Sequence, residues 1–168
     1  VGDQINIELG GVRRRYNAGL ARSIFLGPTP DPIKRLADAT CDAVEAALAA
    51  LKPGTVAEDV YFAYSDALSK HGKEKTSRIG YAIGAAYPPA WVDASVSFWP
   101  GDRTVLAAGM TFHLMCGMWM GDTGFVQSET VLISADGYEL LTNYPQGLVE
   151  KQTSGTSGTT KAPRGRGS

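Results

Sequence analysis

The sequence is poor in the residues that build disulfide frameworks and metal centres. It contains only two cysteines and two histidines among 168 residues. The cysteines, Cys41 and Cys116, form no CxxC motif, and no cluster of cysteine and histidine has the spacing of a zinc site. So few cysteines fit a reducing compartment best, and we therefore expect a cytoplasmic protein.

A strong net charge and long hydrophobic runs are lacking as well. The formal net charge is -1, so nothing in the composition attracts a polyanion, and we expect no nucleic-acid partner. No apolar run approaches the ~20 residues that a membrane-spanning helix needs, and we find no signal peptide and no phosphate-binding loop. These absences argue against membrane, nucleic-acid and P-loop nucleotide functions.

What is present has the composition of one globular domain, and the length suffices to bury a core. We assign residues 1–151 to this domain. From residue 152 onward Ser, Thr, Gly and basic residues dominate, which predicts a disordered tail over residues 152–168. The chain begins at Val1 with a strand-like run directly behind it, which predicts a fragment that lacks an N-terminal part.

The first half of the sequence predicts a β-hairpin followed by two helices. Alternating apolar residues predict a strand over residues 4–9, a turn at Gly10-Gly11 and a returning strand over residues 12–26. Apolar residues at helical spacing predict one helix that Asp31 caps and a second that starts near residue 55, with Glu58 placed for a capping box.

The second half predicts an antiparallel β-meander. The run 109–120 is strongly apolar and predicts a central strand, residues 125–133 a further strand and residues 139–142 a short last one. A hairpin, two helices and a meander in this order make an α+β fold.

The segment 78–91, between the second helix and the central strand, allows two interpretations. It combines closely spaced glycines with a Pro88-Pro89 pair and two tyrosines, Tyr81 and Tyr87. A buried strand that runs into a turn explains glycine and proline. Close approach of the backbone and aromatic rings with hydroxyl tips are also typical of a small-ligand pocket.

Four blocks of the sequence, in the same order, resemble the catalytic domain of the pita-bread fold. The family's hairpin carries two acids, a tyrosine and an arginine, and its later strands carry the blocks His-Gly-Ile-Gly, Gly-Met-x-Phe-x-x-Glu-Pro-Gly and Glu-Asp-Thr-Val-Leu-Val-Thr. The corresponding positions are Glu8, Tyr16, Gly19 and Arg22, then residues 81–84, 109–117 and 128–134. The resemblance implies the C-terminal portion of a creatinase/aminopeptidase-like domain.

The departures from the family pattern bear on chemistry. Members that are peptidases hold two metal ions with two Asp, one His and two Glu. At those five places this sequence has Glu8, Gly19, Tyr81, Met115 and Ser128. Because one carboxylate cannot hold a pair of hard cations, we expect no metal and no other cofactor.

Within the family, the sequence most closely resembles the ectoine hydrolases, over residues 78–91, 110–113 and 128–129. The resemblance implies metal-independent hydrolysis of a small cyclic amidine or a related C–N substrate, with a small molecule as partner and a homodimer in the full-length form. Alternatives are a creatinase-like, aminopeptidase-like or proline-dipeptidase-like enzyme, or a non-catalytic peptide-binding module. Whether the fragment is active alone stays open.

Three residues are candidates for catalysis. Glu8 offers the carboxylate that a planar amidinium needs, as a nucleophile or as a general base, although a solvent-facing strand residue is the plain alternative. His113 could donate a proton or orient the substrate carboxylate, or be a core histidine. Glu129 could position His113 or the cation, or form a cross-strand ion pair.

Four further residues are candidates for binding substrate. Tyr81 and Tyr87 would form pocket walls. Arg22 belongs to the hairpin block of the resemblance, and Asn17 stands where the resemblance to ectoine hydrolases implies a histidine. We assign Trp91 and Trp119 to the core. We expect Glu8, Tyr81, Tyr87, His113 and Glu129 to converge on one pocket; a buried Glu8 would favour the enzyme and an exposed Glu8 the module.

Overall fold

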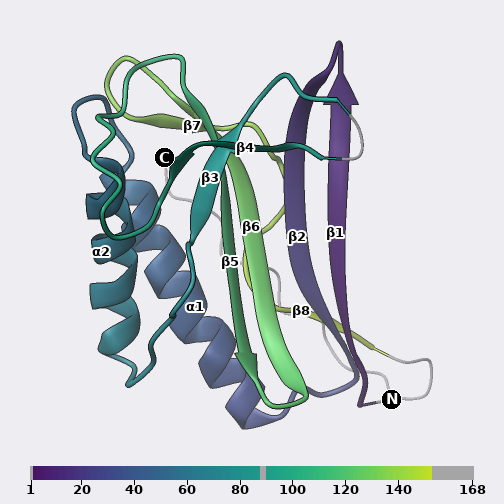
Figure 1. The fold of residues 1–168 in the computed structure, drawn as a ribbon. Helices are drawn as coiled ribbons and strands as arrows, with labels where there is room; N and C mark the ends of the chain where they lie inside the picture. Colours follow the sequence, from purple (N-terminus) through teal and green to yellow (C-terminus); the bar gives the residue numbers. More distant parts are fainter. Residues whose placement is uncertain (1, 88–89, 153–168) are drawn as a thin grey trace.

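A computed structural model describes residues 2–87 and 90–152, and the expected tail, apart from residue 152, and Pro88 lie outside these ranges (Figure 1). The helices are α1 (Asp31–Ala50) and α2 (Ala57–Ser69). The strands of the described chain are β1 (Gln4–Arg13), β2 (Tyr16–Leu26), β3 (Gly80–Ile83), β4 (Val92–Ser97), β5 (Thr111–Met120), β6 (Thr123–Ile133), β7 (Tyr138–Leu140) and β8 (Val149–Lys151).

The strands form a single sheet in the order β1-β2-β6-β5-β3-β4. All pairs along this order are antiparallel, and β7 adds to β6 in the same way. The sequence did not predict β8, which pairs in parallel with β2. The predicted order of hairpin, two helices and antiparallel meander is confirmed.

The predicted turn at Gly10-Gly11 is wrong, because β1 continues through both glycines to Arg13. The chain reverses instead at Arg14 and Arg15, which adopt left-handed φ angles of 51° and 72°. Two successive positive φ angles match the twist of a two-residue hairpin. Gly10 has another role, which is described below with the face of the sheet that carries no helices.

Both predicted helix caps are also wrong in detail. Pro30 is the N-cap of α1, so Asp31 is the first helical residue and makes no side-chain cap. The N-cap of α2 is Val56. The Glu58 carboxylate accepts the backbone N–H of Gly101 at 2.9 Å and pairs with Arg103, so it ties α2 to the loop before β5 instead of closing a capping box.

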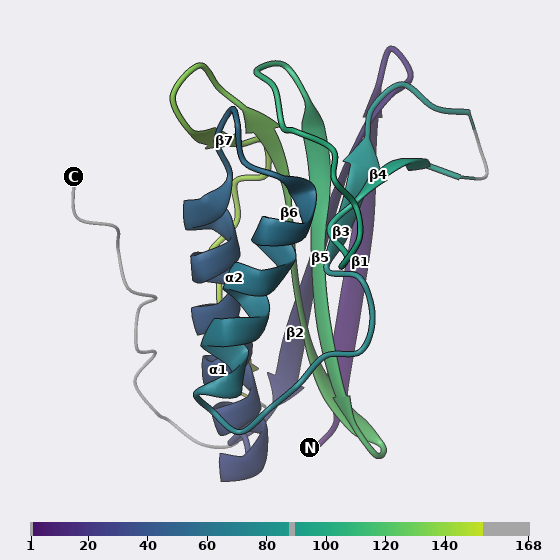
Figure 2. The ribbon, with the colours of Figure 1, turned by 60° about the vertical axis from the view of Figure 1, so that its left-hand side comes forward.

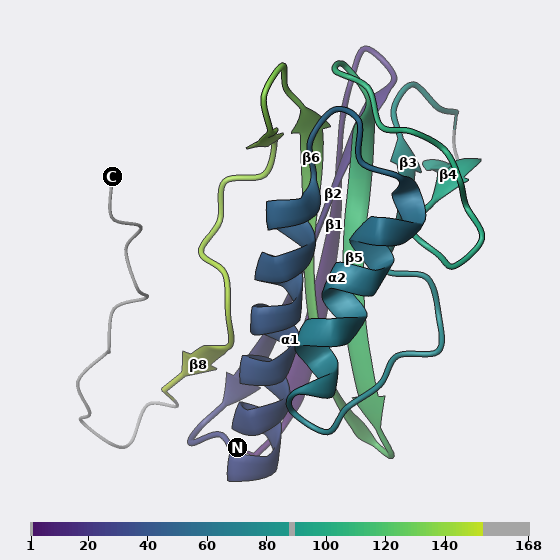
Figure 3. The same ribbon diagram turned by 90° about the vertical axis from the view of Figure 1, so that its left-hand side faces the viewer.

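Both helices lie on one face of the sheet, as the ribbon shows from two sides (Figures 2 and 3). Their apolar stripes meet the side chains of the central strands and form the hydrophobic core, which removes large apolar surfaces from water. Its largest fully buried members include Leu36, Leu51, Tyr64, Leu68, Phe98, Phe112, Leu114 and Phe125. Neither helix is long and apolar enough to cross a membrane.

The face without helices is crossed by the segment that joins β3 to β4. Tyr16 at the hairpin tip forms a β-bridge with Ala85, and the backbone N–H of Asn17 donates to the carbonyl of Gly84 at 3.0 Å. Because β1 and β4 lie at opposite ends of the strand order, these contacts bring the two ends of the sheet together over this face. We call it the open face below.

Candidate functional site

Two glycines of the hairpin make room for aromatic rings on the open face. Gly10 and Gly19 are cross-strand partners on β1 and β2. A Cβ atom on Gly19 would lie 2.8 Å from Cε1 of His113, and one on Gly10 would lie 2.5 Å from Cζ3 of Trp91. The imidazole and the indole therefore rest directly on the hairpin backbone, where any side chain would displace them.

A chain of hydrogen bonds runs along this face. The Tyr81 hydroxyl lies 2.9 Å from Nδ1 of His113, and Nε2 of the same ring lies 2.8 Å from Oγ of Ser128. The backbone N–H of Ala21 donates to Oγ of Ser128 at 2.6 Å. At the other end, Nε1–H of Trp91 donates to the Tyr81 hydroxyl at 3.0 Å. Residues from β2, β3, β5, β6 and the β3–β4 loop thus form one polar cluster.

Burial sets the charge states in this cluster. His113 is fully buried, and burial lowers its pKa to about 4, so the imidazole is neutral at pH 7. Burial is also the main cause that raises the pKa of Tyr81, and the Glu8 carboxylate raises it further. The hydrogen bond from Trp91 and the Arg78 guanidinium, which lies 4.8 Å from the centroid of the Tyr81 ring, act in the opposite direction.

Glu8 lies on the open face but is exposed. It pairs with Ala21 across the hairpin and shares its face of β1 with Gly10, on which Trp91 rests. Its charge acts on the Tyr81 hydroxyl, as the direction of the tyrosine pKa indicates. The structure therefore brings Glu8 to the same face as Tyr81 and His113, as expected, without burying its carboxylate.

Glu129 lies on the helix side of the sheet and does not reach His113. Its cross-strand partner is Leu114, whereas that of His113 is Thr130. Adjacent positions of a strand point to opposite faces, so the two side chains diverge. The expected convergence of Glu129 on the His113 site is therefore not found.

Arg22, which the sequence assigned to substrate, is the partner of Glu129 in a buried ion pair. The guanidinium also donates to the backbone carbonyls of Pro145 at 2.9 Å and Ser128 at 2.7 Å. Removing one partner of such a pair leaves an uncompensated buried charge, at a cost of about 3–5 kcal/mol. The arrangement joins β2, β6 and the segment before β8.

Asn17 and Tyr87 lie at the hairpin tip. The Asn17 amide donates to the carbonyls of Gly84 and Arg15, both at 3.0 Å, and so fastens the β3–β4 loop to the hairpin. Tyr87 is 70% exposed and its hydroxyl accepts a hydrogen bond from Arg15. Both residues stand at the rim of the open face, and Tyr87 is not a buried pocket wall.

Sequence reasoning missed Ser128 and Trp91. Sequence reasoning assigned Ser128 no role of its own, beyond its place in a family block where peptidases have a metal-ligating acid, and it assigned Trp91 to the core. The signal that could have found them is Gly19, another replaced acid. A glycine in the middle of a strand often marks the close approach of another group, which here is the His113 ring.

The residues at the family's metal positions do not fit a metal pair. The set Glu8, Gly19, Tyr81, Met115 and Ser128 contains one carboxylate. The space into which an acid at Gly19 would project is filled by the imidazole of His113. In residues 2–87 and 90–152 no group of three or more His, Cys, Asp and Glu side chains is arranged to hold a metal ion.

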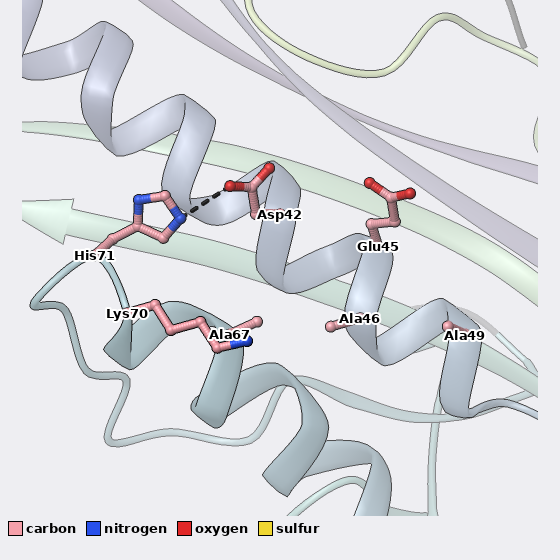
Figure 4. Close-up of a pocket in the computed structure, with 7 residues that line it drawn as sticks. All are labelled: Asp42, Glu45, Ala46, Ala49, Ala67, Lys70 and His71. Carbon is pink, nitrogen blue, oxygen red and sulfur yellow. Dashed lines mark hydrogen bonds and ion pairs between the residues drawn. The ribbon is translucent and has the colours of Figure 1, made fainter.

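Two hollows of the surface lie away from this cluster. One, of about 350 Å³, lies between the two helices, where Nε2 of His71 pairs with the Asp42 carboxylate at 2.9 Å (Figure 4). Its lining is Asp42, Glu45, Ala46, Ala49, Ala67, Lys70 and His71. The other, of about 150 Å³, is lined by Ile7, Leu9, Leu20, Arg22, Ile24 and Tyr144 on the helix side of the hairpin.

Comparisons with known proteins agree with the fold. The sequence pattern of Metallopeptidase family M24 matches residues 1–135. The chain is 41% identical over 146 residues to the uncharacterized hydrolase/peptidase y4tM of Sinorhizobium fredii, and 37% identical over 151 residues to the ectoine hydrolase of Halomonas elongata. These matches cover 87% and 89% of this chain but 37% and 38% of the relatives, so the chain spans less than half of their length.

Solved structures show the same arrangement. The dipeptidase PepE of Mycobacterium ulcerans superposes with a TM-score of 0.84 at 25% identity, over 91% of this chain and 41% of that protein. The prolidase of Pyrococcus furiosus gives a TM-score of 0.79 at 24% identity, over 86% of this chain and 42% of that one. These two likenesses concern the fold.

Proposed function

The chain belongs to metallopeptidase family M24, and on that premise we propose that it hydrolyses a small cyclic amidine such as ectoine, or a related C–N compound, without a metal ion. The observation that carries the proposal is the His113 ring on Gly19, in the space that a metal-ligating acid would need. The similarity to the ectoine hydrolase of Halomonas elongata supports the substrate class.

One carboxylate and two aromatic rings on the open face suit such a substrate, although the Arg78 guanidinium lies 4.8 Å from the Tyr81 ring centroid and repels a cation. An amidinium is planar and positively charged, and it is recognised by a carboxylate and by aromatic surfaces. Glu8 provides the carboxylate, and Tyr81 and Trp91 lie on the same face. One acid is sufficient for a single delocalised cation, although it is insufficient for two divalent ions.

Glu8 fits two chemical roles. As a general base it would take a proton from the attacking water, a contribution typically worth about 10²–10⁴ in rate. As a nucleophile it would bond to the amidine carbon, the ring C–N bond would break with its electron pair and a proton going to the departing nitrogen, and water would then cleave the bond between Glu8 and the carbon to leave the amide and the free carboxylate. Glu8→Gln removes both roles while keeping the shape of the side chain.

The exposure of Glu8 favours a second candidate, a non-catalytic module that binds a peptide. In such a module the carboxylate would contribute to a surface and not to a reacting centre, and replacing one exposed charge would have a small effect. The two candidates therefore differ in how strongly function depends on Glu8.

The cellular setting is part of the proposal. We expect the activity in the cytoplasm, with a small molecule as substrate. Cys41 and Cys116 are both free thiols in the structure, which fits a reducing compartment.

The test follows the ring opening of ectoine by proton NMR. The protein assayed is a full-length member of the family that carries the residues of this chain. We expect turnover that a chelator leaves unchanged, that Glu8→Gln abolishes, and that Asp3→Asn, the matched loss of an exposed acid just before β1, leaves intact. If a chelator abolished the activity and cobalt or manganese restored it, the metal-free mechanism would be wrong and a metallopeptidase would be the better interpretation. Peptide binding that Glu8→Gln does not change, without turnover of ectoine or creatine, would favour the module.

A further inference from the structure

The hydroxyl of Ser128 has a single place for its proton. A serine hydroxyl donates once and accepts twice. Oγ of Ser128 already accepts the N–H of Ala21, and among the described residues the remaining hydrogen-bond partner is Nε2 of His113. Ser128 is fully buried, so a hydroxyl proton that pointed elsewhere would meet neither solvent nor an acceptor among the described residues. Ser128 therefore donates to Nε2.

This donation fixes the tautomer of His113. A neutral imidazole carries one proton, and if Nε2 accepts from Ser128 the proton lies on Nδ1. Nδ1–H then donates to the Tyr81 oxygen at 2.9 Å. The indole N–H of Trp91 donates to the same oxygen at 3.0 Å. The phenol oxygen thus accepts two hydrogen bonds, and its own proton has no acceptor among the described residues. Either tautomer leaves one of the two hydroxyl protons unpaired; Tyr81 is 5% exposed and Ser128 is 0% exposed, so the unpaired proton costs less on Tyr81, where it points toward the open face.

The unpaired hydroxyl proton of Tyr81 lies on the open face of the sheet, which also carries Glu8. We propose that the Tyr81 hydroxyl is the proton donor of this site, and that Ser128 holds it in the donating state through the tautomer of His113. The inference rests on the proposed hydrolytic function and deepens it. Tyr81 is the catalytic residue, whereas His113 and Ser128 are positioning residues.

The arrangement suits a group that gives up a proton and takes it back. The raised pKa of Tyr81 keeps the phenol protonated at neutral pH before reaction. When the proton leaves, Nδ1–H of His113 and Nε1–H of Trp91 already point at the oxygen that becomes negative. Donors that are oriented in advance stabilise a developing oxyanion without reorganisation.

With Glu8 as base, the reaction balances. The oxygen of water bonds to the amidinium carbon while a water proton passes to Glu8. The C–N bond of this adduct breaks, and its electron pair stays on the nitrogen, which takes the proton of Tyr81. As the carbonyl forms, the hydroxyl proton of the adduct passes to the Tyr81 phenolate, and Glu8 gives its proton to the released amine. One water is consumed, an amide and an ammonium group form, and both side chains are restored.

The tautomer can be measured without any substrate. The chain has two histidines, so His71→Gln, at the surface beside α2, leaves a single imidazole for ¹⁵N NMR. We expect a protonated Nδ1 and an unprotonated Nε2 on His113 at pH 7. In Ser128→Ala the proton should shift toward Nε2, and Ser128→Thr, which keeps a hydroxyl, should retain it on Nδ1. A protonated Nε2 in the protein with Ser128 intact would overturn the proposal, because Tyr81 would then donate inward.

Turnover tests the catalytic assignment. Where the unaltered protein opens a cyclic amidine, Tyr81→Phe should lower kcat by about 10²–10⁴ and change KM little, as expected for a lost proton donor. Ser128→Ala should lower kcat and Ser128→Thr should recover part of it. Wild-type kcat in Tyr81→Phe would overturn the proposal and leave the proposed function standing. The NMR result needs no turnover, so its failure is distinct from failure of the amidine assay.

Discussion

His113 is a neutral imidazole in the folded protein. Its side chain is completely buried, and both of its ring nitrogens are engaged in hydrogen bonds, one with Tyr81 and one with Ser128. In the unfolded chain the ring titrates near 6.5, whereas burial lowers the pKa in the fold to about 4. Between these values the unfolded state binds a proton that the folded state does not bind. The free energy of unfolding should therefore rise with pH across this window and fall as the pH is lowered through it.

We predict that this single group changes the free energy of unfolding by about 3 kcal/mol between pH 4 and pH 7, since one pKa unit corresponds to about 1.4 kcal/mol. Urea unfolding at a series of pH values measures the effect. Above pH 5 most carboxylates are already ionised, so the remaining increase in the free energy of unfolding with pH should be absent in His113→Gln. It should be present in His71→Gln. Equal slopes in the unaltered protein and His113→Gln would contradict a neutral, buried His113.

The same residues show how far the sequence can be read. The resemblance led to His113, Tyr81 and Glu8, which the structure places on one face. The resemblance could not show that the partner of His113 is Ser128 and not Glu129, because the partner depends on which face of the sheet each position of the strand occupies. A one-residue difference in position along β6 separates a cluster on the open face from an ion pair on the helix side.

At the scale of elements, the hairpin is the part that sequence patterns described least well. Gly10-Gly11 is a typical turn signal, and the turn lies instead at Arg14 and Arg15. Two glycines of the hairpin, Gly10 and Gly19, are explained only by side chains from distant segments: Trp91 rests on Gly10 and His113 on Gly19. The helices, by contrast, follow from local periodicity and were placed within a few residues.

This account of the hairpin predicts an asymmetric response to alanine. Gly19→Ala should push the His113 ring from Ser128 and Tyr81 and lower the free energy of unfolding by about 1–3 kcal/mol, the usual cost of overpacking. Gly11→Ala lies on the same hairpin, and apart from its chain neighbours no atom of the described residues comes nearer than 3.8 Å to the added Cβ, so the free energy of unfolding should stay the same or rise by up to about 1 kcal/mol.

Urea unfolding and the ¹⁵N shifts of His113 measure both consequences. Gly19→Ala should alter the His113 nitrogens, and Gly11→Ala should leave them as they are. Equal stability of the two variants, with unchanged His113 shifts, would show that the imidazole does not rest on the hairpin backbone.

At the scale of the whole molecule, the two helices cover only part of their face of the sheet. They pack on the central strands, whereas the outer strand β1 lies at the edge of the sheet away from both helices (Figure 1). On the helix side of β1, Ile5, Ile7 and Leu9 are 41%, 38% and 57% exposed, next to the hollow of about 150 Å³ that Tyr144 helps to line. Contiguous apolar side chains at a sheet edge are typical of surfaces that associate.

We therefore predict that the chain self-associates through the helix side of β1. The driving force is burial of these side chains, each of which contributes about 1.5–3 kcal/mol when it moves fully out of water. Sedimentation velocity should show the average mass rising with protein concentration. Leu9→Ser should weaken this association.

Val12→Ser is the matched control for that experiment. Val12 lies on the same strand and is 63% exposed, but the alternation of β1 places it on the opposite, open face. Loss of an apolar side chain there should leave the association unchanged, because the helix side stays intact. If the unaltered chain sediments as a monomer at every concentration, the exposed side chains of β1 do not form a contact surface. If Leu9→Ser and Val12→Ser weaken association equally, the contact does not belong to the helix side.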